Sequence, residues 1–181
     1  VLHGRGPDDV VECTLVLGAE MLRAGGLEHS TAAAERRLRA AISSGAARNK
    51  LAKLIAAQRG DPRVVEEPDR LPRAPCVVEI TASAAGYIRD LDSRAIAELA
   101  LRLGAGRTRA DQRIDPAVGI VLCKKPGDRV RRGEALAQLH MRTRAELGPS
   151  RDALLAAYDI GKRPPARQPL VIEVMRPRRR R

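Results

Sequence analysis

The stretch of sequence that decides the fold covers residues 124–139 and reads Lys-Lys-Pro-Gly-Asp-Arg-Val-Arg-Arg-Gly-Glu-Ala-Leu-Ala-Gln-Leu. Residues 125–128 have the composition of a turn, and Gly133 marks a second turn shortly after it. Apolar runs at 118–123 and 135–140 flank the turns, and both are typical of strands. The stretch therefore predicts a tight β-hairpin system.

The sequence on both sides of this stretch predicts more strands and two helices. Three further segments are apolar or β-branched and are expected as strands: 76–81, 86–88 and 170–174. Two segments are expected as helices: 94–103 and 149–157. Ser93 is expected to cap the first of them, and Gly104 to end it. These elements predict a mixed α+β domain over residues 76–175.

The beginning of the chain differs, because its apolar residues recur at helical spacing. Three helices are predicted there: 7–24, from Ser30 or Thr31 to Ile42, and 46–58. The first is apolar nearly all round, with Val10, Leu17 and Met21 on one stripe. A helix of that kind is normally buried on more than one side.

A Pro-rich segment separates these two halves. Residues 61–75 hold four prolines and many charges, which disfavour both helices and central strands. We therefore expect a helical segment at 1–60, a linker at 61–75, the α+β domain at 76–175 and an Arg-rich tail at 176–181. The fold class predicted for the chain is α+β.

The composition of the 181 residues excludes several classes of protein. Phe and Trp are absent and there are two Tyr, so aromatic platforms for stacking bases are excluded. No uncharged apolar run approaches the ~20 residues of a membrane span, and Arg5 and Asp8 interrupt any signal peptide. The three cysteines are far apart, which argues against zinc or disulfide scaffolds and indicates a reducing, cytoplasmic location.

The net charge of +12 depends strongly on the last six residues. Five of them are Arg, so the charge of +12 would fall to +7 without those five. Such a tail can bind nucleic acid or a membrane surface by counterion release. Because phosphate contacts alone carry no specificity, we interpret the tail as a solvated end and expect neither nucleic acid nor membrane as a partner.

Few side chains suggest catalysis or ligand binding. The segment 104–107, Gly-Ala-Gly-Arg, has groups for an anion, but it follows a helix and is expected to be a left-handed C-cap. His3, His29 and His140 lack ligand partners at suitable spacing. Neither a phosphate-binding glycine loop nor a nucleophile elbow occurs. We therefore expect no catalytic, phosphate-binding or metal residue and no cofactor in this chain.

Residues 127–136 resemble a string found in biotinyl and lipoyl carrier domains, Gly-Asp-x-Val-x-x-Gly-x-x-Leu. A carrier also needs a lysine on an exposed hairpin tip, normally well away from that string. Here Lys124 and Lys125 lie directly beside it. A shared piece of fold does not imply a shared function, and the position of the lysines argues against a carrier.

Eight strings in order resemble the middle and end of thymidine and pyrimidine-nucleoside phosphorylases. Residues 56–62, Ala-Ala-Gln-Arg-Gly-Asp-Pro, are similar to the family's A-A-Q-G-G-D-P, with Arg59 replacing Gly. Residues 160–165 are similar to I-G-D-x-P-P, with Lys162 replacing Asp. The other strings are at 4–9, 14–22, 84–88, 103–107, 114–120 and 125–140. The resemblance covers nearly the whole chain and implies the end of an α/β domain followed by a barrel-sandwich-like C-terminal domain.

The resemblance also implies an activity, nucleotide salvage by a pentosyltransferase. In the family, inorganic phosphate cleaves a pyrimidine nucleoside to the free base and (deoxy)ribose 1-phosphate. The family's K-x-S-T-G-G phosphate loop and base-binding residues lie in its N-terminal half and are absent from this sequence. Some members bind a cation through a Glu in G-E-G-P, where this chain has Arg5, which cannot ligate a cation. No functional residue of the family is carried over to this chain.

The expected role is therefore that of a scaffold, inactive alone, whose partner is the missing N-terminal half. The family further implies a homodimer formed through a helical domain that this chain lacks. An apolar patch larger than a few hundred Å2 is expected on residues 1–60, where that half would pack. A non-catalytic regulatory or assembly module that shares this domain is the alternative, and an Arg-tailed nucleic-acid-binding protein is a third hypothesis.

Overall fold

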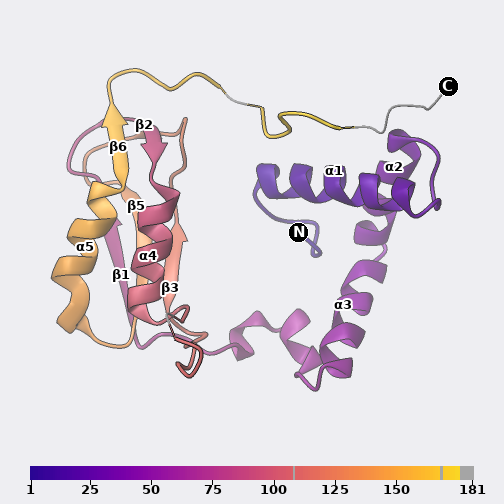
Figure 1. The fold of residues 1–181 in the computed structure, drawn as a ribbon, viewed down its shortest axis with the longest axis horizontal. Coiled ribbons are helices and arrows are strands. Elements are labelled where there is room, and N and C mark those ends of the chain that lie inside the picture. The colour runs from indigo at the N-terminus through magenta and orange to yellow at the C-terminus, as the bar shows by residue number, and fades with distance from the viewer. Residues whose placement is uncertain (108, 168, 176–181) are drawn as a thin grey trace. The chain divides into compact units, whose positions relative to one another are not determined.

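The protein is described from a computed structural model, which covers residues 1–107, 109–167 and 169–175 (Figure 1). The Arg-rich tail, residues 176–181, lies outside the described residues. The chain divides into two compact units, Val1–Arg70 with Gln168–Arg181 and Leu71–Arg167. We call them the helical unit and the α+β unit. One boundary between the units falls inside residues 61–75 and the other follows Arg167, before the expected end of the α+β domain at residue 175. The sequence of elements is the predicted α+β mixture.

The helical unit contains the three predicted helices. They are followed by two short 3-10 helices, and the elements are α1 (Asp8–Ala24), α2 (Thr31–Ser43), α3 (Ala46–Ala57), η1 (Pro62–Val65) and η2 (Pro68–Arg70). The Ser30 hydroxyl caps α2 by accepting a hydrogen bond from the amide of Ala33 at 3.2 Å. This cap satisfies one of the free donors at the helix start, and Ser30 rather than Thr31 is the capping residue.

α1 packs on α2 through one of its faces. Leu15 and Ala19 are buried, and Gly18 allows the helices to approach closely, because a Cβ there would lie 2.8 Å from Leu38 Cδ1. Leu17 and Met21 lie on the opposite side and are 61% and 74% exposed. The described residues therefore cover only one face of α1, and apolar side chains are exposed on the other, as expected where the covering N-terminal half is absent.

The α+β unit contains six strands and two α-helices among the described residues. The strands are β1 (Cys76–Thr81), β2 (Gly86–Leu91), β3 (Gly119–Leu122), β4 (Arg129–Val130), β5 (Ala135–Met141) and β6 (Tyr158–Gly161). The helices are α4 (Ser93–Leu103) and α5 (Leu147–Ala156), preceded by the short η3 (Arg144–Glu146). α4 and α5 pack against each other beside the strands (Figure 1).

The strands form two antiparallel three-stranded sheets, in the orders β1-β5-β3 and β4-β2-β6. Consecutive strands along the chain alternate between the sheets. β4 is part of the connection between β3 and β5, but it pairs with β2 of the other sheet, where Val130 lies opposite Gly86. The two runs predicted to flank the turns do pair with each other as β3 and β5, with Ile120 opposite Leu139. The predicted tight hairpin is wrong in its connection, because the short strand β4 inside it joins the other sheet.

One apolar core holds the sheets and helices of this unit together. Ile88, Leu99, Leu139 and Leu154 are almost completely buried in it, one from each of β2, α4, β5 and α5. The core contains no Phe or Trp, as the composition requires. Tyr158 is the only aromatic residue in the described cluster of buried side chains.

The C-cap of α4 is the predicted residue, whereas its N-cap differs from the prediction. Gly104 has φ 99° and ends the helix in the left-handed conformation, as predicted. The N-cap is Asp92 rather than Ser93, because the Asp92 carboxylate accepts a hydrogen bond from the amide of Ala95 at 2.9 Å. A carboxylate there also favours the positive end of the helix dipole.

The predicted strand at 170–174 is wrong: these residues form no strand in the structure. A strand needs a neighbour to satisfy its backbone groups, and no described residue pairs with this segment. β6 was missed by sequence reasoning, although it follows α5 directly and pairs with β2. Its four residues, Tyr-Asp-Ile-Gly, are too few and too mixed to stand out as a strand.

Candidate functional site

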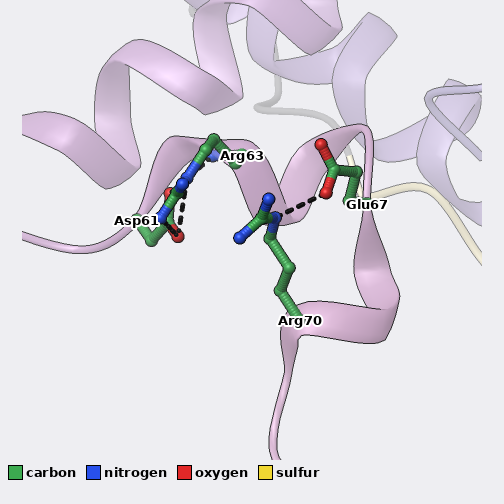
Figure 2. A network of polar contacts seen from close by, with 4 residues as sticks. All are labelled: Asp61, Arg63, Glu67 and Arg70. Carbon is green, nitrogen blue, oxygen red and sulfur yellow. Dashed lines mark hydrogen bonds and ion pairs between the residues drawn. The ribbon is translucent and has the colours of Figure 1, made fainter.

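The turn at residues 56–62 is held by ion pairs within the chain. Asp61 caps η1 by accepting the Arg63 amide at 3.0 Å, and its carboxylate also accepts Arg63 Nε and Nη2 at 2.9 and 2.8 Å. Glu67 accepts Arg70 Nε at 2.6 Å in the next turn (Figure 2). The Arg63 guanidinium lowers the pKa of Asp61 to about 2. This network fixes a turn on the surface, and its arginines are already occupied by carboxylates.

Arg59 in the same turn has an unusual backbone conformation. It is the only described residue other than glycine with a positive φ, at 64°. Its amide donates to the carbonyl of Ala56 at 3.0 Å, and its side chain is exposed. A left-handed conformation favours glycine, which is the residue that the resembling string has at this position.

Lys124 is held by two oxygens rather than presented to a ligand. Its ammonium lies 2.6 Å from Glu134 Oε1 and donates to the carbonyl of Arg129 at 3.4 Å. Glu134 in turn accepts the amide of Arg131 at 2.8 Å, and the Lys124 ammonium lowers the pKa of the Glu134 carboxyl. A lysine fixed in this way is a poor site for attaching a carrier cofactor.

Tyr158 at the start of β6 stabilises the start of β5 and the connection from β3 that precedes it by hydrogen bonds to their backbone. Its buried hydroxyl lies 2.9 Å from the carbonyl of Leu136 and 3.2 Å from that of Lys124. Burial, with a smaller effect from Cys123 and Asp128, raises the pKa of Tyr158 to about 12. Sequence reasoning missed this residue, although a tyrosine in a chain almost without aromatic residues was a possible signal.

The remaining groups that the sequence raised do not assemble into a site. The amides of Gly104 and Ala105 donate back to the carbonyls of Leu101 and Ala100, so they are not available to an anion. His3 bonds the carbonyl of Val65 at 2.7 Å. His29 is exposed in a turn, and His140 lies on β5. Within the described ranges, no group of three or more His, Cys, Asp or Glu side chains could hold a metal ion.

A charged depression of about 630 Å3 lies at the end of the α+β unit, and sequence reasoning missed it. Arg89, Asp159, Lys162 and Arg163 line it, together with Asp90, Pro164 and Pro165. Arg89 Nε lies 3.5 Å from Asp159 Oδ2, so one of its cations is already paired. Both partners of that pair are more than half exposed, and the depression is too open to exclude water from a reaction.

An apolar depression of about 370 Å3 lies between α1 and α2 in the helical unit. Val11, Leu15 and Ala19 form its floor, and the Arg39–Glu35 ion pair borders it. On α1, Leu17 and Met21 are exposed as well. None of the helices in the described part of the chain is long and apolar enough to cross a membrane.

Comparison with known proteins identifies the part of the chain that carries the resemblance. Residues 87–161 match the family described as the pyrimidine nucleoside phosphorylase C-terminal domain. Pyrimidine-nucleoside phosphorylases of Staphylococcus aureus strains USA300 and NCTC 8325 are 42% identical over 139 residues, which are 77% of this chain and 32% of each relative. The protein of the bovine strain RF122 matches equally. The aligned part is about a third of these relatives' length.

Proposed function

Because the chain is the C-terminal portion of a pyrimidine-nucleoside phosphorylase by sequence, we propose that it supports the phosphorolysis of pyrimidine nucleosides. The reaction would convert a nucleoside and inorganic phosphate into the free base and (deoxy)ribose 1-phosphate. The observation that carries the proposal is the 42% identity to pyrimidine-nucleoside phosphorylases over 77% of this chain. Inorganic phosphate is the co-substrate, and no cofactor is invoked for this chain.

The proposed contribution of the chain is structural. Phosphorolysis needs donors for the phosphate and for the negative charge that develops on the leaving base. The described residues offer no enclosed set of such donors: Arg63, Arg70 and Lys124 are paired with carboxylates, and the amides at the end of α4 are used within the helix. These pairs support a role as scaffold, with the reacting groups supplied by the preceding part of the enzyme.

The wider setting follows from the same proposal. The complete enzyme would be a cytoplasmic homodimer that assembles through a helical domain upstream of this chain. The uncovered face of α1, with Leu17 and Met21 exposed, supports packing against the preceding part, because large exposed apolar patches mark interfaces. The charged depression near Lys162 has no role in this proposal.

The deciding experiment measures phosphate-dependent release of thymine or uracil from thymidine or uridine. It compares this chain with the gene product extended upstream. We expect cleavage by the extended protein that requires phosphate, and none by this chain. Cleavage by this chain alone would contradict the scaffold role. If the extended protein also fails to cleave either nucleoside, the non-catalytic regulatory or assembly module replaces the proposed function.

A further inference from the structure

The segment at residues 169–175 has the sequence of a strand, but it pairs with no strand among the described residues. It reads Pro-Leu-Val-Ile-Glu-Val-Met, so Leu170, Ile172 and Val174 would lie on one side of an extended chain. In the structure these three side chains are 47%, 87% and 44% exposed, and Met175 is 88% exposed. No backbone hydrogen bond joins this segment to another described residue. An apolar segment of this pattern whose amides and carbonyls have no backbone partner among the described residues is suited to pairing with a strand edge.

The two sheets of the α+β unit do not supply that edge. Both sheets belong to Leu71–Arg167, whereas the end of the chain is grouped with Val1–Arg70. The described part of that helical unit contains only helices and connections, because the first strand of the chain is β1 at Cys76. A strand partner for residues 169–175 must therefore come from outside the described chain.

The length of the relatives indicates where the partner lies. The aligned residues make up 32% of each Staphylococcus aureus phosphorylase, and the matched family is a C-terminal domain. Most of the remaining length in those relatives must therefore precede the aligned part. The helical unit independently needs a cover, since Leu17 and Met21 on α1 are exposed. An uncovered helix face and an unpaired strand are the two components expected when a helix-covered sheet has lost its other strands.

We propose that residues 169–175 form a strand in a β-sheet whose other strands come from the part of the phosphorylase that precedes residue 1. This inference rests on the proposed function, since it takes the preceding part to be the lobe that holds the substrates. The chain would then leave that lobe after the helical unit, form the α+β unit, and return to the lobe through its last described residues. The returning strand would fasten both ends of the α+β unit to one body.

The test measures hydrogen exchange of the amides of residues 170–175 in this chain and in the gene product extended upstream. We expect fast exchange in this chain and exchange slowed at least 100-fold for part of the segment in the extended protein. The variant Ile172→Asp should lower the thermal midpoint of the extended protein and restore fast exchange. Ile114→Asp is the matched control, because Ile114 is 52% exposed in the α+β unit and should change neither measurement.

Several results would overturn the proposal. Fast exchange at 170–175 in an extended protein that cleaves nucleosides would reject the strand and leave the proposed function intact. Slow exchange in an extended protein without phosphorolysis would reject the function and retain the pairing. Protection of these amides in this chain alone would also reject the proposed partner: a dimer by light scattering would assign the strand to a second copy, and a monomer to the chain itself.

Discussion

The turn after α3 provides a stability prediction that depends on one backbone angle. Arg59 has φ 64°, and a residue with a Cβ in that conformation is less stable by about 1–2 kcal/mol than glycine would be. Glycine adds freedom to the unfolded chain, which costs about 0.4–1 kcal/mol. Because the Arg59 side chain is exposed, Arg59→Gly should stabilise the helical unit by about 0.5–1 kcal/mol.

Thermal unfolding followed by circular dichroism at 222 nm measures this change, because the helices dominate that signal. A gain of this size corresponds to a rise of about 2–8 °C in the midpoint for a unit of this length. Both tyrosines, Tyr87 and Tyr158, lie in the α+β unit, so the tyrosine fluorescence transition should stay unchanged.

The control Arg59→Ala separates the backbone from the side chain. Alanine removes the guanidinium but keeps the Cβ, so this variant should gain nothing. Equal midpoints for Arg59→Gly and Arg59→Ala would refute the argument from the left-handed conformation. A second comparison is Gly60→Ala, which should destabilise, because a Cβ there would lie 2.8 Å from Ile55 Cγ2.

Three further changes have defined outcomes. Tyr158→Phe should destabilise the α+β unit by about 1 kcal/mol through the lost hydrogen bond. Since burial raises the folded pKa of Tyr158 to about 12, the contribution of this hydroxyl to the stability of the wild type should be complete below pH 10 and lost as the pH rises toward 12. Alkaline denaturation should not show this loss in the variant. Gly86→Ala should lower the free energy of unfolding by about 1–3 kcal/mol in urea denaturation, because its Cβ would lie 2.7 Å from the Gly161 carbonyl oxygen. Gly148→Ala in α5 meets open space and should not destabilise. A hydrophobic dye should bind the wild-type chain, and the double variant Leu17→Glu and Met21→Glu should bind much less of it. A monodisperse wild-type protein that binds no dye would contradict an exposed apolar patch.

The helices were predictable because their signals are local. Ser30 and Gly104 mark helix ends by their own chemistry, and the structure confirms both. Strand pairing was not predictable in the same way. β4 has two residues and pairs with β2 about forty positions earlier, so no local pattern in 124–140 indicates its partner. The segment 170–174 has the composition of a strand but no edge to join among the described residues.

The sequence predicted the state of a candidate group only where the partners of that group are close to it in the chain. The left-handed cap at Gly104 was predicted because it follows a helix, and the amides of Gly104 and Ala105 are used by the carbonyls of that helix. The ion pair between Lys124 and Glu134 was not predictable, since the nine residues between them first cross to the other sheet. The strained angle at Arg59 became visible only in the structure, although the glycine in the resembling string was a hint.

The alternation of the six strands between two sheets has a consequence for synthesis on the ribosome. No strand of this unit pairs with the strand before or after it in the chain, so neither sheet can grow by adding hairpins as the polypeptide emerges. The first sheet can close only when β5 is complete at Met141, and the second only when Gly161 has left the exit tunnel. Contacts between such distant segments slow folding. The nascent unit therefore stays open until almost all of it has been made, and its apolar strands need protection from aggregation during that time.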